Sequence, residues 1–293
     1  MSIIGFDLNK NRLQGYAILT ICLFLIAYVI LRAKNLSLTY DEIITYEIQK
    51  TFTLADAGKT ANTHLLNTYL ISASCYFFGI SELALRLPNV LALLIYLFAA
   101  VKSAFFFRSN IRLHVFILLT LMPFLVDFFS LARGYGLGVS LMLLSVYYFF
   151  RFIDNNKITN AAISIIVSML AVLANYTILN YFLPLTGVLV LIVLFNKSSV
   201  KSKRLSILFL SFLSVAFVLI IAPTLFELKS GGQLFFGGRT NIYVDTIASL
   251  GKCFGYHTNY SSLAQGIFVF CFLSTVVTAM VFCVILVKKR TAS

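Results

Sequence analysis

The sequence predicts an all-α protein, a polytopic transmembrane helix bundle that forms a single membrane domain over residues 1–293. Hydrophobic residues make up 60% of the chain and charged residues only 11%, and the mean hydropathy is +0.95. A water-soluble protein of this length cannot bury so many apolar side chains. Apolar segments also recur from residue 14 to residue 287 without a long polar stretch, so no separate soluble domain is expected.

A helix needs about 20 apolar residues to cross the roughly 30 Å hydrocarbon core of a bilayer. Eight runs meet this requirement, at residues 14–33, 87–107, 113–131, 135–152, 158–175, 178–196, 205–226 and 264–287. The first run follows Lys10 and Arg12, but it is too long for the core of a signal peptide and lacks a small-residue cleavage site. We therefore expect it to remain as a helix.

The stretch HLLNTYLISASCYFFG, residues 64–79, is either a ninth span or a helix lying at the membrane interface, because it is short and partly polar. The interfacial placement leaves 14 of the 23 basic residues on the inner side, with only two acids. The positive-inside rule therefore favours eight spans with both termini in the cytoplasm. A first outer loop at 34–85, containing the interfacial helix, and a second outer loop at 227–263 then face outward, where we expect any chemistry.

The formal net charge of +13 does not indicate a nucleic-acid partner, because the basic residues are scattered among short loops and form no patch with aromatic residues. The five cysteines do not form a disulfide framework, since Cys22, Cys271 and Cys283 lie in apolar runs. No clustered metal-ligand spacing and no glycine-rich phosphate loop are present either. The sequence predicts no cofactor, although it leaves a divalent metal open.

The acidic pair Asp41 and Glu42, in SLTYDEIITYEIQK, directly follows the first predicted span. One interpretation is a solvated loop, and the other is a general base held at the membrane surface, close to a lipid headgroup and an aqueous acceptor. Asp127 lies about one turn inside the third predicted span, where an unpaired charge costs at least ~2.5 kcal/mol. We expect Arg86 or Arg133 as its partner, unless Asp127 is protonated or reaches the interface.

Three basic residues are expected on the same outer side as the acidic pair. His64 opens the interfacial stretch, Arg86 stands at the mouth of the second span, and Arg133 lies at the junction of the third and fourth spans. Pro88, just after Arg86, suits the first turn of a helix. Each of the three could be merely solvated or snorkelling to the interface, but together with the acids they gather at one leaflet.

These stretches resemble the membrane glycosyltransferases of the C superfamily (GT-C), which include protein O-mannosyltransferases and the aminoarabinose transferases of lipid A. TYDEIITYE, 39–47, is similar to the acidic pair that follows the first span of the family, and NTHLLNTYL, 62–70, resembles its interfacial helix with a histidine. GISELALRLPNVLALL, 79–94, resembles the start of its second span, and SLARGYGL, 130–137, the region after its third. The resemblance covers roughly residues 15–155.

The resemblance implies a transferase on the outer side of a bacterial inner membrane that uses a polyprenyl-phosphate-linked sugar as donor and a glycan or lipid as acceptor. Asp41 would be the base of an inverting reaction, and Glu42 would orient Asp41 or the sugar. The residues implied to bind the donor and its phosphate are His64, Arg86, Arg133 and Tyr135. No obligatory metal follows from such a donor.

Two other function classes fit a basic membrane bundle: a transporter or flippase of lipid-linked oligosaccharides, and a catalytically silent membrane subunit. A transporter should carry charged groups along a continuous internal path. The marked residues of this chain are instead expected at one leaflet, and this difference favours the enzyme.

Overall fold

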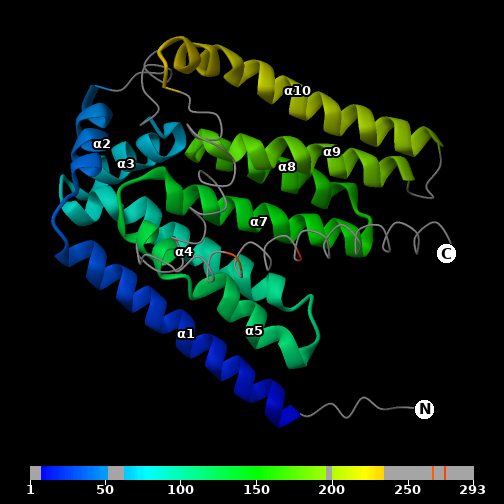
Figure 1. Ribbon diagram of the computed structural model, residues 1–293, viewed down its shortest axis with the longest axis horizontal. Helices are drawn as coiled ribbons and strands as arrows, with labels where there is room; N and C mark the ends of the chain where they lie inside the picture. The colour runs from blue at the N-terminus through cyan, green and yellow to red at the C-terminus, as the bar shows by residue number, and fades with distance from the viewer. Residues whose placement is uncertain (1–7, 52–62, 196–199, 234–265, 267–273, 275–293) are drawn as a thin grey trace. The chain divides into compact units, whose positions relative to one another are not determined.

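A computed structural model of the chain describes residues 8–51, 63–195 and 200–233, together with Gly266 and Ser274 (Figure 1). The eighth predicted span, 264–287, and most of the second outer loop predicted at 227–263 lie outside the described residues. Within the described ranges the chain forms helices and no strands, in agreement with the all-α prediction.

The chain divides into two compact units, Met1–Leu183 and Pro184–Ser293. The first unit contains, in chain order, α1 (Leu8–Asn35), α2 (Tyr40–Thr51), α3 (Leu65–Phe78), α4 (Glu82–Ala104), α5 (Ser109–Thr120), α6 (Pro123–Asp127), the 3-10 turn η2 (Phe128–Ser130), α7 (Gly134–Asn155), α8 (Ile158–Ala174) and the 3-10 turn η3 (Tyr176–Ile178). The helix α9 (Leu179–Phe195) begins in this unit, and α10 (Val200–Ser230) lies in the second.

The described part of the chain contains five helices that are long and apolar enough to cross a membrane. They are Arg12–Asn35 of α1, Glu82–Ala104, Gly134–Asn155, Tyr176–Phe195 and Ser202–Ser230 of α10. The helices α3 and α8 are apolar but shorter. Large apolar side chains such as Leu23 and Phe24 of α1 lie exposed, as expected of a surface that faces lipid. The chain is thus an all-α membrane helix bundle, whereas the count of eight spans stays a prediction.

The helix α3 does not cross the first unit. Arg86, near the start of α4, donates hydrogen bonds to the carbonyls of Ala33 and Leu36 at the end of α1. The chain therefore leaves α1 and enters α4 at the same end of the unit, and α2 and α3 form the connection at that end (Figure 1). Among its described residues, the segment predicted as the first outer loop, 34–85, is largely helical.

The helix α4 starts at Glu82, earlier than residue 87, where the sequence predicted the second span to start. Ser81 caps α4 by accepting a hydrogen bond from the Ala84 amide at 3.1 Å, so Pro88 lies in the interior of the helix and the prediction of a first-turn proline is wrong. A proline has no N–H for the carbonyl four residues earlier, which here is that of Ala84. Ser74 of α3 donates its hydroxyl to this carbonyl at 2.7 Å and so joins α3 to α4.

The segment predicted as one span over 113–131 is broken into α5 and α6, which are bent by 57°. The break occurs at Pro123, and Met122 before it is extended, as residues that precede proline tend to be. The carbonyl of Leu119, four residues before Pro123, accepts a hydrogen bond from the Tyr96 hydroxyl of α4. The carbonyls four residues before Pro88 and before Pro123 are thus each bound by a side chain of a neighbouring helix.

The helices α7 and α8 lie side by side (Figure 1), and the turn between them begins at Asn156, which has a left-handed φ of 56°. The hydroxyls of Ser145 and Ser164 each donate to the backbone carbonyl of the other residue at 2.8 Å. Small residues at such positions let helix backbones approach closely in a membrane. The helix α3 packs against both α7 and α8, and α4 packs against α7.

Candidate functional site

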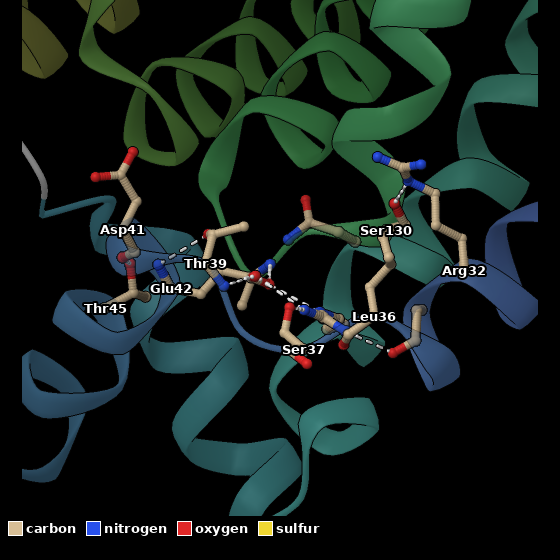
Figure 2. A network of polar contacts seen from close by, with 12 residues as sticks. Arg32, Leu36, Ser37, Thr39, Asp41, Glu42, Thr45 and Ser130 are labelled. Carbon is tan, nitrogen blue, oxygen red and sulfur yellow. Dashed lines mark hydrogen bonds and ion pairs between the residues drawn. The ribbon is translucent and has the colours of Figure 1, made fainter.

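The acidic pair lies in the first turn of α2, and this helix begins with a capping box. The Thr39 hydroxyl accepts a hydrogen bond from the Glu42 amide at 3.4 Å, and the Glu42 carboxylate accepts one from the Thr39 amide at 2.9 Å. This is the reciprocal pattern of a Thr-x-x-Glu helix start. Consecutive side chains of an α-helix point about 100° apart, so Asp41 and Glu42 diverge. Figure 2 shows the Asp41 carboxylate directed away from the polar network that Glu42 enters.

Glu42 forms a bidentate ion pair with Arg86, and both side chains are fully buried. Arg86 Nε donates to Glu42 Oε1 at 2.8 Å, and Nη2 donates to Oε2 at 2.9 Å. The remaining N–H groups of Arg86 donate to the carbonyls of Ala33 at 2.8 Å, Leu36 at 2.6 Å and Ser37 at 3.0 Å. All five N–H groups of the guanidinium are therefore used inside the protein.

Glu42 receives two backbone hydrogen bonds in addition to those from Arg86. The amide of Thr39 donates to Oε2 at 2.9 Å, and the amide of Ala132, just before α7, donates to Oε1 at 2.8 Å. We call Glu42, Arg86 and the five backbone groups that they bind the clamp. It joins the end of α1, the start of α2, the first turns of α4 and the segment that leads into α7.

The clamp keeps Glu42 ionised. Burial acts to raise the pKa of the Glu42 carboxyl, but the hydrogen bonds from Arg86, Thr39 and Ala132, together with the charge of Arg86, outweigh it and lower this pKa below its usual value. A carboxylate that accepts four hydrogen bonds is a poor proton acceptor. Glu42 is therefore suited to hold the fold and not to act as a base.

This geometry changes the roles that the resemblance implied for the clamp residues. Arg86 was expected to bind the donor phosphate, but none of its N–H groups remains for a phosphate oxygen. Glu42 was expected to orient Asp41 or the sugar, but its carboxylate binds Arg86 and two amides. Both residues instead join segments of the first unit to one another at this end.

Asp41 and Arg133 meet on the exposed side of the clamp. The Asp41 side chain is 58% exposed, whereas that of Arg133 is 6% exposed, and Arg133 Nη2 lies 3.8 Å from Asp41 Oδ2. The Arg133 guanidinium also lies over the Tyr135 ring, 5.6 Å from its centre. Asp41 precedes Glu42, and Arg133 follows Ala132, so the clamp fixes the neighbours of both charged residues. The structure thus brings together three of the residues that the sequence marked.

His64 is buried, and its ring forms an edge contact with the Tyr135 ring, with centroids 5.2 Å apart. The imidazole hydrogen-bonds to the carbonyl of Ala174 at the end of α8. A Cβ atom at Gly134 would lie 2.0 Å from the Ala174 oxygen and 2.7 Å from His64 Cβ. Only glycine at 134 therefore lets His64 and the end of α8 meet over the start of α7.

His64 is a neutral imidazole at physiological pH. Burial, and next the charge of Arg133, lower the pKa of His64 to about 4 despite the hydrogen bond to Ala174. Its Nε2 is buried and has no hydrogen-bond partner among the described residues, so the proton lies on Nδ1, which faces Ala174. The resemblance implied that His64 contacts the donor phosphate. The unprotonated Nε2 can accept a hydrogen bond, but it cannot donate one to a phosphate oxygen.

Asp127 pairs with Arg32 of α1, whereas Arg86 or Arg133 was expected. Arg32 Nη2 lies 3.3 Å from Asp127 Oδ2, and the Tyr28 hydroxyl donates to Oδ1 at 3.0 Å. Arg32 Nε also donates to the Ser130 hydroxyl at 3.0 Å, and Figure 2 shows these two residues on the side of the network opposite Asp41. The sequence signal for Arg32 was its position at the outer end of the first predicted span, level with Asp127.

A buried relay of two amides, which the sequence interpretation did not single out, supports α3. Asn67 and Asn89 are fully buried. The Leu137 amide of α7 donates to Asn89 Oδ1 at 2.9 Å, and Asn89 Nδ2 donates to Asn67 Oδ1 at 3.0 Å. The signal that could have found Asn89 is an asparagine within the first turn of the predicted span 87–107, where an unsatisfied amide is costly.

Within the described ranges, no three His, Cys, Asp or Glu side chains come close enough to hold a metal ion. Comparison of the chain with known protein families, with curated proteins and with solved structures found no match.

Proposed function

We propose that the protein is a membrane glycosyltransferase that transfers a sugar from a polyprenyl-phosphate-linked donor to a glycan or lipid acceptor. The observation that carries the proposal is the separation of two adjacent carboxylates. Glu42 is buried in the clamp, while Asp41 is exposed beside Arg133. A carboxylate that points outward next to a guanidinium combines a proton acceptor with a group that binds phosphate.

In the proposed reaction Asp41 acts on the acceptor and Arg133 acts on the donor. The oxygen of an acceptor hydroxyl attacks the anomeric carbon, and its proton passes to the Asp41 carboxylate. The bond between the anomeric carbon and the phosphate oxygen breaks, so the configuration inverts and the polyprenyl phosphate leaves. Arg133 offsets the charge that develops on this phosphate. Arg133 takes this role in the proposal because its guanidinium lies beside Asp41, whereas Arg86 is fully buried in the clamp.

Asp41 and Arg133 do not need to move far to act. Their 3.8 Å separation lies near the upper limit of an ion pair, so a phosphate can bind Arg133 while Asp41 turns toward the acceptor. Tyr135, which packs against Arg133, would form the floor of this site. We expect the reaction at the outer face of a bacterial inner membrane, as the positive-inside rule predicts.

A transfer assay tests the proposal. The full chain would be purified, reconstituted in vesicles and incubated with radiolabelled undecaprenyl-phosphate sugars and extracted acceptor glycans. Label should move from the lipid to the glycan with the natural chain and not with Asp41→Asn. Movement of the sugar lipid across the bilayer without transfer would instead support a transporter, and the absence of both activities would support a silent subunit.

A further inference from the structure

We propose that the end of the first unit opposite the clamp binds the phosphate headgroups of anionic phospholipids, through basic side chains that lie over aromatic rings. Gln14 of α1 donates to the carbonyl of Ser109 at the start of α5 at 2.8 Å, and α4 and α7 both lead away from the clamp. The start of α1, the end of α4, the start of α5 and the end of α7 therefore gather at one end, toward the right of Figure 1. Such binding does not depend on the proposed sugar transfer.

The two ends of the first unit differ in charge. We call the basic end the set of Arg12, Lys102, Arg108, Arg112, Arg151 and Lys157, and the acid near them in the described ranges is Asp154. At the clamp end acids and bases are equal in number: Asp41, Glu42, Glu47, Glu82 and Asp127 against Arg32, Lys34, Lys50, Arg86 and Arg133. All ion pairs among the described residues of this unit lie at the clamp end. The protein therefore leaves the charge of the basic end uncompensated.

Three cations of the basic end are held over aromatic rings. The distances to the ring centres are 4.1 Å for Arg112 over Phe105, 5.7 Å for Lys102 over Phe98 and 5.9 Å for Arg151 over Tyr147. A guanidinium that stacks on a ring contacts it with its face, so the ring uses none of the N–H groups at the edge. The rings also order these long side chains in advance, which lowers the entropy that binding an anion would cost.

Aromatic contacts connect the cations of α4 and α7 into one surface. The Tyr147 ring of α7 lies 6.2 Å from that of Phe98 in α4 and 5.8 Å from that of Phe106, between centroids. Phe106 in turn lies 5.8 Å from Phe150 of α7. Phe98, Phe106 and Phe150 are exposed. The surface thus presents apolar rings and uncompensated positive charge side by side.

This combination fits a phospholipid with a net negative charge. The surface lies at the ends of two helices that are long and apolar enough to span a membrane, Glu82–Ala104 and Gly134–Asn155. At that level an anionic lipid offers a phosphate to the cations and an acyl chain to the rings. Arg108 and Arg112, one helical turn apart on α5, repel each other unless an anion lies near both. A zwitterionic lipid brings a positive charge of its own and compensates this surface less.

Lipid binding by the purified full chain in detergent tests the inference. Native mass spectrometry measures the dissociation constants of phosphatidylglycerol and of phosphatidylcholine with the same acyl chains. The double variant Arg112→Gln/Arg151→Gln removes two of the charges that lie over rings. Its matched control is Lys34→Gln/Lys50→Gln, which removes the same charge from exposed positions at the clamp end. Inorganic phosphate, added as a competitor, distinguishes a site for a lipid headgroup from a site for free phosphate.

We expect phosphatidylglycerol to bind the natural chain at least about tenfold more tightly than phosphatidylcholine, because each basic residue near a membrane surface contributes about fivefold to the attraction of anionic lipid. Arg112→Gln/Arg151→Gln should lose most of this preference, while its phosphatidylcholine binding stays within about twofold and shows that the variant is folded. Lys34→Gln/Lys50→Gln should keep the preference. Equal binding of both lipids by the natural chain, an equal loss in the two double variants, or displacement of the lipid by an equal concentration of inorganic phosphate would each overturn the inference. None of these results would affect the proposed transfer.

Discussion

The clamp predicts that Glu42→Gln destabilises the protein strongly although the substitution preserves shape. The Glu42 carboxylate accepts four hydrogen bonds, two at each oxygen. A glutamine has one acceptor oxygen, and its NH₂ group must face two N–H donors whichever way the amide is turned. Arg86 would at the same time lose its counter-charge in a fully buried position.

The expected cost follows from these lost contacts. Removing one partner of a buried ion pair costs about 3–5 kcal/mol, because the other charge stays buried without compensation. Arg86→Lys keeps the charge but replaces five N–H groups by three, so at least two of the five acceptors lose their donor, at roughly 1–3 kcal/mol each. Exchanging both residues for apolar ones should not restore stability, because the backbone groups at the end of α1 and before α7 would remain unsatisfied.

The measurement is thermal unfolding of each purified variant in the same detergent, followed by size-exclusion chromatography after heating. The matched control is Glu47→Gln, which lies on the same helix, is 62% exposed and pairs only with the exposed Lys50 among the described residues. This control should change the free energy of unfolding by less than about 0.5 kcal/mol. If Glu42→Gln unfolded at the same temperature as Glu47→Gln, the reasoning about the clamp would be wrong.

Three further predictions concern the groups around the clamp. Asp41→Asn should lower glycan transfer by roughly 10²–10⁴, the range for loss of a general base, while the unfolding temperature and donor binding change little; wild-type transfer by this variant at matched expression would leave the enzyme without its base. Gly134→Ala should destabilise the protein and lower its unfolding temperature, because the added Cβ meets the Ala174 carbonyl oxygen at 2.0 Å; an unchanged temperature would contradict the tight packing of His64. The pKa of His64 is lowered from 6.5 to about 4, so the unfolded chain binds more protons between these values, and stability should fall by about 1.4 kcal/mol per pH unit as the pH drops through this window. Unfolding temperatures of the natural chain and of His64→Asn over pH 4.5–7 check this dependence, which the variant should lose.

The sequence predicted the helical class and the grouping of the marked residues because both depend on local patterns. Apolar runs of about 20 residues indicate helices of a membrane bundle wherever they occur. Successive predicted spans cross the membrane in alternating directions. This alternation predicts that Asp41, Arg86 and Arg133 lie at the same end of the bundle. The Thr39-x-x-Glu42 capping box was also readable from the sequence, and it would have indicated that Glu42 turns inward at a helix start.

The partners of the charged residues could not be predicted, because they depend on the distances between helices. Both Arg32 and Arg86 stand at a helix end near an acid, and sequence spacing does not distinguish Asp127 from Glu42 as a partner. The structure decides between them through the carbonyls of Ala33, Leu36 and Ser37 at and after the end of α1, which accept hydrogen bonds from Arg86. The break at Pro123 was likewise hidden, since a proline in an apolar run is compatible with a continuous span.

In the proposed transfer the two neighbouring carboxylates have different tasks, because one carboxylate cannot perform both. A group that anchors Arg86 and two amides must stay ionised and immobile, and the hydrogen bonds that achieve this also use the lone pairs that a base needs. A base must present a free lone pair to the acceptor and change its contacts during the reaction. Placing the two functions on consecutive residues of α2 solves this conflict: the buried residue fixes the backbone, and the exposed residue is carried to within 3.8 Å of Arg133. The hydrogen bonds of the clamp thus hold the backbone next to the exposed Asp41, which would position this carboxylate in the proposed transfer.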